Sequence, residues 1–202
     1  MNDKLKKKLI IGGSGFIGKY LIKSMIKNGA QIINFDKTSL DESLDNVATI
    51  IGDVTVGSDS ALWPQAVARG DISSIIIGDR TNIQDGAILH VTHQSEYSKE
   101  YPLKIGNDVT IGHSAILHAC TIKDRCLIGM GSVILDGAVI NQECMIAAGS
   151  LVGPGKNIES GYLYVGSPAK QFRKLTDKEK KFLIYSAKSY VDLKNEYKKS
   201  ET

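Results

Sequence analysis

The sequence lacks any apolar run close to the ~20 residues that a membrane-spanning helix needs, so we expect no membrane contact. Its three cysteines include no Cys-x-x-Cys pair, which argues against a disulfide framework and favours free thiols in a cytoplasmic protein. It also lacks a strong charge of one sign, because 25 basic and 22 acidic residues leave a net charge of +3, carried by lysines near both ends. Aromatic residues do not alternate with these lysines, so no nucleic-acid surface is predicted.

A six-residue repeat dominates the chain from residue 51 onward. Its longest unbroken series of periodic apolar residues comprises Ile122, Ile128, Ile134, Ile140, Ile146, Val152 and Ile158. Such a period is typical of a parallel β-helix, in which three short strands complete one triangular coil and the periodic residue points inward. An α-helix would need apolar residues at a spacing of 3.6, which this region does not sustain. The sequence therefore predicts a mainly β fold.

Two further segments accompany the repeat. Residues 91–104 are polar, contain Pro102 and predict a loop that leaves the β-helix. Near the C-terminus, Thr176-x-x-Glu179 forms a capping box, which predicts a helix packed on the β-helix or on a neighbouring subunit. The expected apolar stripe of this helix is Leu183, Ala187, Tyr190, Leu193 and Tyr197. We accordingly divide the chain into an N-terminal unit (1–50), a β-helix (51–170) and a C-terminal helix (171–202).

Three of the four histidines occupy related positions of the repeat. His90 and His118 each directly follow an inward leucine, so they should lie on one edge in adjacent coils, about 5 Å apart. His113 lies one face earlier and leaves the β-helix in a different direction, so we expect a three-fold trimer to complete the set. Three imidazoles with one open position are typical of a catalytic zinc site, where bound water becomes hydroxide near neutral pH. The fourth histidine, His93, lies in the polar loop and is predicted to be solvated.

Five stretches of the sequence carry a resemblance to one family: WPQAVARGD, IGDRTNIQDGAILHVTH, VTIGHSAILHACTI, LIGMGSVILDGAVI and YVGSPAKQFRKLT. Together they resemble the γ-class carbonic anhydrases over about residues 50 to 200. The resemblance implies a left-handed parallel β-helix that forms a homotrimer with zinc, or iron in its place, at each subunit interface. It also implies that His90 and His118 ligate the metal from one subunit and His113 from the next.

The same resemblance assigns roles to further residues. Arg69, Asp71 and Asp85 match a charged network across the trimer interface, and Asn82 and Gln84 match catalytic polar groups beside the metal-bound water. A neutral amide can orient this water without competing for the metal. The implied reaction is the hydration of carbon dioxide to bicarbonate by zinc-bound hydroxide.

The sequence departs from the family at the position where a proton shuttle is expected. Ile72 follows the Arg-Gly-Asp triplet, and the loop offers only Glu96 and Glu100, neither with an obvious counterpart. Weak or silent catalysis is therefore part of the prediction, and two alternatives stay open. One is a hexapeptide acyltransferase that uses acetyl-CoA with one histidine as general base. The other is a metal-binding assembly protein without turnover.

The N-terminal unit has no six-residue repeat. It follows the order strand, glycine turn, helix and strand, with Gly13, Gly15 and Gly18 in the turn and Asp36 after the second strand. This is the context of a dinucleotide-binding fingerprint and resembles the start of extended short-chain dehydrogenases and epimerases. A dinucleotide crevice needs a second half-sheet, whereas here a β-helix follows. We therefore interpret the unit as a small Rossmann-like βαβ cap over the open end of the β-helix, and we do not expect NAD to bind.

Overall fold

The computed structural model describes residues 8–11, 32–35 and 48–200. The first two segments are strands β1 (Lys8–Ile11) and β2 (Ile32–Phe35), which pair in parallel as a separate two-stranded sheet. Both strands were expected, but the positions assigned to dinucleotide binding lie outside the described residues: Gly13, Gly15, Gly18 and Asp36. The Rossmann-like cap therefore stays a prediction.

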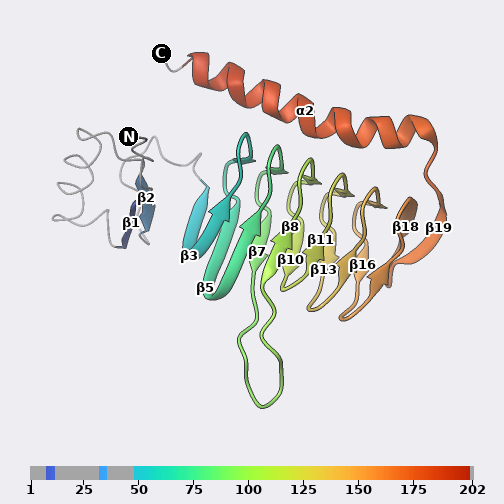
Figure 1. The fold of residues 1–202 in the computed structure, drawn as a ribbon, viewed down its shortest axis with the longest axis horizontal. Coiled ribbons are helices and arrows are strands. Elements are labelled where there is room, and N and C mark those ends of the chain that lie inside the picture. The colour runs from blue at the N-terminus through green and yellow to red at the C-terminus, as the bar shows by residue number, and fades with distance from the viewer. Residues whose placement is uncertain (1–7, 12–31, 36–47, 201–202) are drawn as a thin grey trace, which may run out of the picture.

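The body of the protein is a parallel β-helix with three faces, which confirms the fold predicted from the repeat (Figure 1). The first face contains the start of β5 (Val67–Ile77), β7 (Ile88–His90), β10 (Ile116–His118), β13 (Val133–Ile134) and β16 (Leu151–Val152). The second face contains the end of β5, β8 (Leu103–Ile105), β11 (Thr121–Ile122), β14 (Val139–Ile140) and β17 (Asn157–Ile158). The third face contains β4 (Ala61–Leu62), β6 (Asn82–Ile83), β9 (Thr110–Ile111), β12 (Leu127–Ile128), β15 (Met145–Ile146), β18 (Tyr162–Val165) and the antiparallel β19 (Lys170–Lys174). Strand β3 (Thr49–Val56) pairs with β5 along both of the first two faces.

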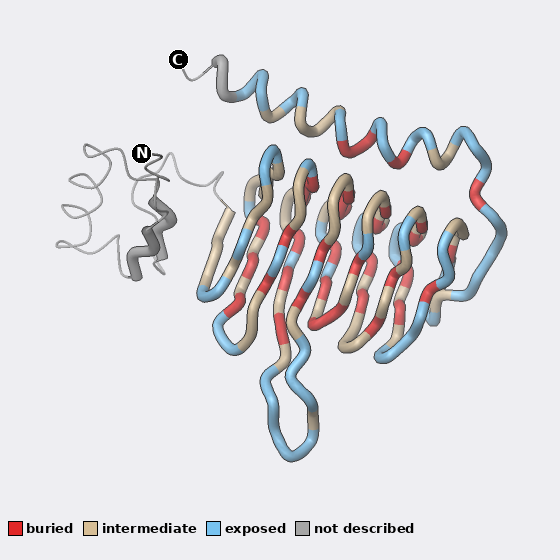
Figure 2. The backbone as a smooth tube through the Cα atoms, in the orientation of Figure 1, coloured by how far each residue is buried: buried red, intermediate tan, exposed pale blue. Residues whose placement is uncertain are grey.

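The core is the column of periodic residues that the sequence predicts. On the third face Ile83, Ile111, Ile128 and Ile146 lie in register in successive coils, and all four are fully buried. Figure 2 shows buried residues recurring along the coils. Burying one such side chain contributes about 1.5–3 kcal/mol, which stabilises strands too short to form alone.

Glycine often follows the periodic residue because successive coils approach closely at that point. A Cβ atom at Gly112 would lie 2.7 Å from the backbone nitrogen of Met130, and one at Gly129 would lie 2.4 Å from that of Ala148. Any larger residue would force these coils apart, so the glycines follow from the packing of the coils.

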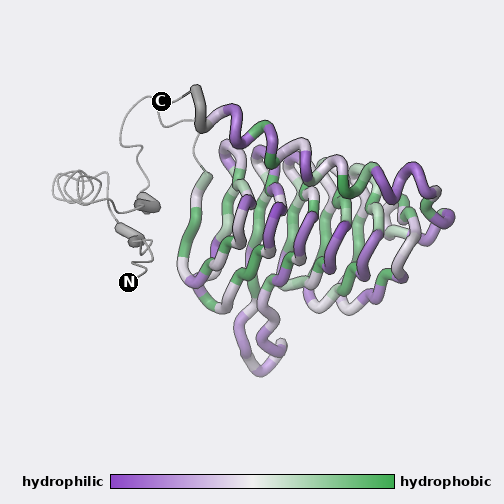
Figure 3. Tube along the Cα trace, turned by 45° about the horizontal axis from the view of Figure 1, so that its top comes forward, coloured by the Kyte–Doolittle hydropathy of each residue, from purple (hydrophilic) through white to green (hydrophobic). Residues whose placement is uncertain are grey.

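A long loop leaves the β-helix between β7 and β8, as predicted (Figure 1). Thr92 and Tyr101 form an antiparallel bridge at its base. Figure 3 shows hydrophilic residues along this loop, and His93 and Tyr97 within it are exposed. All three cysteines are buried free thiols, in agreement with the expectation.

The C-terminal helix α2 (Asp177–Ser200) begins at the predicted capping box. The Thr176 N–H donates to the Glu179 carboxylate (2.8 Å), and the Glu179 N–H donates to the Thr176 hydroxyl (3.2 Å). The helix lies along the third face, where it contacts β4, β6 and β9. In the described part of the chain, no helix is long and apolar enough to cross a membrane.

The predicted apolar stripe of α2 faces the β-helix except at Leu193. Leu183 and Ala187 are buried, and the rings of Tyr190 and Tyr197 pack edge-on against Trp63, with centroids 5.5 and 5.7 Å away. Leu193 is 38% exposed. The buried side also includes Ser186, whose hydroxyl lies 2.9 Å from that of Thr110.

Candidate metal centre

The structure brings His90 and His118 together on one edge of the β-helix. Strands β7 and β10 pair in register, so the inward Leu89 and Leu117 stack and the following histidines lie side by side. The ring centroids are 5.0 Å apart, and Nδ1 of His90 lies 3.1 Å from Nε2 of His118.

A carboxylate faces the outer nitrogen of each of these rings. Asp71 lies 3.3 Å from Nε2 of His90, and Asp136 lies 2.6 Å from Nδ1 of His118. A neutral ring that directs its N–H at its carboxylate presents a lone pair on the inner nitrogen, and the two inner nitrogens lie 3.1 Å apart. This separation is close to the roughly 3.3 Å between two nitrogens that each lie about 2.0–2.1 Å from a tetrahedral zinc. The pair thus fits a shared cation.

Hydrogen bonding favours the ionised form of both carboxylates. Burial alone would raise the pKa of Asp136, but hydrogen bonds from Thr92 and His118 outweigh it, so the pKa is lowered. Burial acts in the same way on Asp71, and hydrogen bonds from Arg69 and His90 lower its pKa. Burial also lowers the pKa of His90 itself, despite the nearby Asp71, which favours the neutral ring that a metal requires.

His113 lies elsewhere, in the turn between β9 and β10, one corner of the coil before His118. Its Nδ1 lies 3.0 Å from Asp85, so its Nε2 is the nitrogen left to accept or to ligate. Across the described residues of a single chain, no three histidine, cysteine or acidic side chains form a group that could hold a metal. One chain therefore presents two imidazoles at one edge and the third at another.

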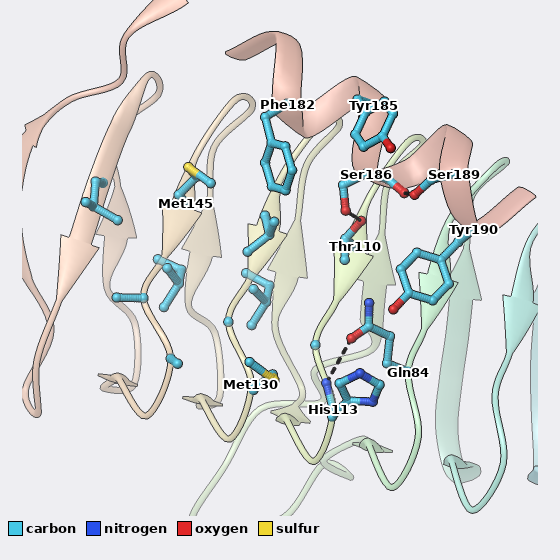
Figure 4. Close-up of a pocket in the computed structure, with 18 residues that line it drawn as sticks. Gln84, Thr110, His113, Met130, Met145, Phe182, Tyr185, Ser186, Ser189 and Tyr190 are labelled. Atoms are coloured by element: carbon cyan, nitrogen blue, oxygen red, sulfur yellow. Dashed lines mark hydrogen bonds between the residues drawn. The ribbon is translucent and has the colours of Figure 1, made fainter. Parts of the chain in front are cut away.

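The amides of Asn82 and Gln84 lie beside His113. Both side chains are buried on the third face, with exposed fractions of 2% and 6%. The Gln84 amide donates to Asn82 (3.2 Å), and its oxygen accepts the backbone N–H of His113 (3.2 Å; Figure 4). Asn82 in turn donates to the Thr110 hydroxyl (3.1 Å). This chain of hydrogen bonds fixes the corner that carries His113.

The three residues expected at a subunit interface contact one another or a histidine within the chain. Arg69 forms an ion pair with Asp71 at 2.6 Å, and the same carboxylate faces His90. Asp85 contacts His113. Each of the three histidines thus has its own carboxylate, an arrangement that fixes the tautomer of metal-binding imidazoles.

Sequence reasoning missed Asp136 and Thr92. Asp136 follows His118 by 18 residues, and its second oxygen accepts the Thr92 hydroxyl at 2.5 Å. The sequence feature that could have identified Asp136 is its position as an acidic residue in the corner of the coil that follows His118.

A groove of about 500 Å³ lies between the third face and α2 (Figure 4). Its polar end contains Gln84, His113 and Tyr190, and burial raises the pKa of Tyr190, so this phenol is a neutral donor at neutral pH. Its other end is lined by apolar side chains, among them Met145 and Phe182.

The chain belongs to the hexapeptide-repeat family. The family described as bacterial transferase hexapeptide (six repeats) matches residues 102–136 and 119–154. Protein YrdA of Escherichia coli K12 is 57% identical over 155 residues, which are 76% of this chain and 84% of YrdA.

Within this family, the chain is similar to proteins named carbonic anhydrase. A probable carbonic anhydrase of Methanocaldococcus jannaschii is 49% identical over 146 residues, 72% of this chain and 88% of that protein. Gamma carbonic anhydrase 2, mitochondrial, of Arabidopsis thaliana is 42% identical over 185 residues, 90% of this chain and 66% of that protein. A solved Bacillus cereus structure described as a putative acetyltransferase is also similar, with 48% identity, a TM-score of 0.71 and coverage of 77% of this chain and 86% of that one.

Proposed function

We propose that this protein is a carbonic anhydrase of the γ type, which hydrates carbon dioxide to bicarbonate at metal sites shared between the subunits of a homotrimer of left-handed β-helices. One observation carries the proposal: Nδ1 of His90 and Nε2 of His118 face each other 3.1 Å apart, while a carboxylate faces the outer nitrogen of each ring. Such a pair is stable at neutral pH when a cation lies between the two nitrogens.

The metal would be held by Nδ1 of His90, Nε2 of His118 and Nε2 of His113 of the partner subunit. Zinc fits this donor set best, and iron is the alternative, because imidazole suits both ions. A zinc ion with three imidazole ligands lowers the pKa of a water to about 7, a value established for carbonic anhydrases in general, and so supplies a hydroxide nucleophile.

The residues around the ligands position them. Asp71, Asp85 and Asp136 each hold a proton on the outer nitrogen of one histidine, so that the other nitrogen presents its lone pair. Gln84 fixes the backbone of His113 without introducing a charge that competes for the metal. Gln84 and Tyr190 also form the polar end of the groove, where their N–H and O–H groups can orient the oxygens of carbon dioxide and bicarbonate.

Hydration releases a proton, and its export would limit the rate. The loop acid Glu100 accepts a hydrogen bond from the Ser73 hydroxyl at 2.8 Å, which ties it to β5. Glu96 is exposed on the same loop. Without a carboxylate free at the site, we expect turnover to be slow and to depend on the buffer.

An acyltransferase is the second candidate, because the Asp85–His113 pair at the groove has the geometry of a general base with its orienting carboxylate. This candidate needs no metal and predicts that acetyl-CoA binds along the groove. It gives the facing nitrogens of His90 and His118 no role, and we therefore favour the hydratase.

The deciding experiment combines metal analysis with stopped-flow carbon dioxide hydration on the purified protein. We expect about one zinc per chain, and hydration that is lost together with the metal in His90→Ala. His93→Ala is the matched control, because this histidine lies in the exposed loop, and it should change neither quantity. A well-folded protein without metal that binds acetyl-CoA at micromolar concentration would support the acyltransferase. Full metal content without hydration would support the non-catalytic assembly protein.

A further inference from the structure

Asp136 has both of its carboxylate oxygens engaged. Oδ1 lies 2.6 Å from Nδ1 of His118, and Oδ2 accepts the Thr92 hydroxyl at 2.5 Å. A carboxylate held at both oxygens cannot rotate away from the imidazole without breaking two charge-assisted hydrogen bonds. The direction of the His118 ring is therefore set from outside the two-histidine edge.

The base of the long loop holds Asp136 in place. Thr92 and Tyr101 exchange backbone hydrogen bonds of 3.2 and 3.1 Å where the loop leaves and re-enters the β-helix. Tyr101 also lies over the turn that carries Asp136, since a Cβ atom at Gly137 would be only 3.4 Å from its ring. Thr92 contacts the Asp136–Gly137 turn by a hydrogen bond and Tyr101 contacts it through its ring.

The other two carboxylates are held differently. Asp71 lies 3.3 Å from His90 and is paired with Arg69, and Asp85 lies 3.0 Å from His113. Asp136 makes the shortest of the three contacts, and it is the one linked to the loop.

We propose that Asp136 is a positioning residue that fixes the His118 tautomer with the proton on Nδ1 and Nε2 as the metal-binding atom, and that Thr92 holds Asp136 at the loop base. The proposal rests on the metal site of the proposed function. In this proposal the loop supports metal binding through Thr92. This role does not require the loop to supply a proton-shuttle acid.

The test is zinc affinity, measured by competition with a chelator on the full-length protein. Asp136→Ala should weaken zinc binding by roughly 10- to 100-fold, the usual effect of losing such a partner. Asp136→Asn should lose less, because its amide oxygen still accepts the imidazole N–H. Asp108→Asn is the matched control: this carboxylate lies in another hexapeptide turn, pairs with Arg80 at 2.6 Å and contacts no histidine. Its zinc affinity should stay within about two-fold of the wild type.

Thr92 provides a second, milder perturbation. Thr92→Val keeps the shape but removes the hydroxyl, so zinc affinity should fall severalfold, whereas Thr92→Ser should restore it. An equal loss in the valine and serine variants would contradict the role of the hydroxyl.

The tautomer of His118 gives a readout without metal. Nitrogen NMR of the metal-free protein should show the proton on Nδ1 in the wild type and a mixture of tautomers in Asp136→Ala. If the folded Asp136→Ala protein keeps both its tautomer and its zinc affinity, the proposal is wrong. Loss of zinc with an unchanged tautomer also overturns it. If the wild type binds no zinc, the proposed function fails, but the tautomer still decides the role of Asp136.

Discussion

The first and second faces of the β-helix are built on the same repeat but present different outward residues. On the first face one in-register column of outward residues is apolar from β5 to β16: Val67, Ile88, Ile116, Val133 and Leu151. On the second face the equivalent column is mixed: Ile76, Lys104, Thr121, Val139 and Asn157. The inward residues of both faces are apolar, so the two faces differ only in the polarity of their outward side chains.

This difference indicates which face another copy of the chain covers. The exposed fractions of Ile88 and Ile116 are 43% and 37%, and their column runs beside the edge that carries His90 and His118. A continuous exposed apolar column is typical of an interface, whereas an interrupted one with lysine suits solvent. The third face is covered by α2 of the same chain and is therefore not assigned to the interface or to solvent. We therefore expect the first face to lie in the subunit interface and the second face to remain in water.

The sharpest test of the comparison replaces one equally exposed isoleucine on each face. Ile88→Lys should dissociate the trimer and abolish most metal binding, since an unpaired charge would be buried in the interface. Ile76→Lys is the matched control, because Ile76 has the same exposed fraction of 43% on the second face. Sedimentation and zinc analysis distinguish the two. Dissociation by Ile76→Lys, or an intact trimer with Ile88→Lys, would reverse the assignment of the faces.

Mixing two inactive variants tests whether the first-face edge meets the His113 corner of another chain. His113→Ala and His118→Ala chains, unfolded together and reassembled in equal amounts, should regain about a quarter of the wild-type metal. An intact site needs His113 from a His118→Ala chain and the His90–His118 edge from a His113→Ala chain. Each position is filled correctly in about half of the random assemblies, which gives about a quarter. Each variant alone should regain none. Trimers of the mixture that remain free of metal would show that the site is not shared in this way.

Gln84 lies on the third face and should affect the reaction more than the metal. Gln84→Ala removes the acceptor of the His113 N–H and the donor to the Asn82 oxygen, and a buried group left without its partner costs about 1–3 kcal/mol. We expect a severalfold or larger decrease in hydration with metal content nearly unchanged. A loss of metal as large as in His90→Ala would make Gln84 a metal ligand.

A smaller effect is expected for Glu179, which stabilises the start of α2 in a pH-dependent way. Hydrogen bonds from Arg173 and Thr176 lower the pKa of Glu179 to about 2. Because the folded pKa lies below the unfolded value of about 4.3, this stabilisation is complete above pH 4.3 and is lost as the pH falls towards 2. Glu179→Gln should therefore lower the melting temperature slightly at pH 7, and the difference should shrink below pH 3. Trp63, the sole tryptophan, contacts Tyr190 of α2 and reports the helix by fluorescence. A difference independent of pH would exclude the ionised carboxylate as the cause.

The six-residue repeat is visible in the amino-acid sequence, and the features that depend on its register can be predicted from it. A buried residue at every sixth position predicts the inward column, the three faces and the shared edge of His90 and His118, because each is a matter of register along the chain. The capping box likewise predicts where α2 begins, since Thr176 and Glu179 are only three residues apart. Local rules suffice where the interacting residues are close in the chain or paired in register between coils.

The side-chain contacts at the corners of the coils depend on three-dimensional packing and could not be predicted from the repeat. Asp136 reaches His118, and Thr92 reaches Asp136, because turns of unequal length shift diagonal neighbours between coils, and the six-residue repeat does not record that shift. Leu193 departs from the predicted stripe, and the neighbouring Lys194, whose side chain is only 14% exposed, pairs with Asp59 at 2.9 Å. The histidine partners of Asp71 and Asp85 also follow from packing: both acids were expected at an interface, and within the chain both face a histidine.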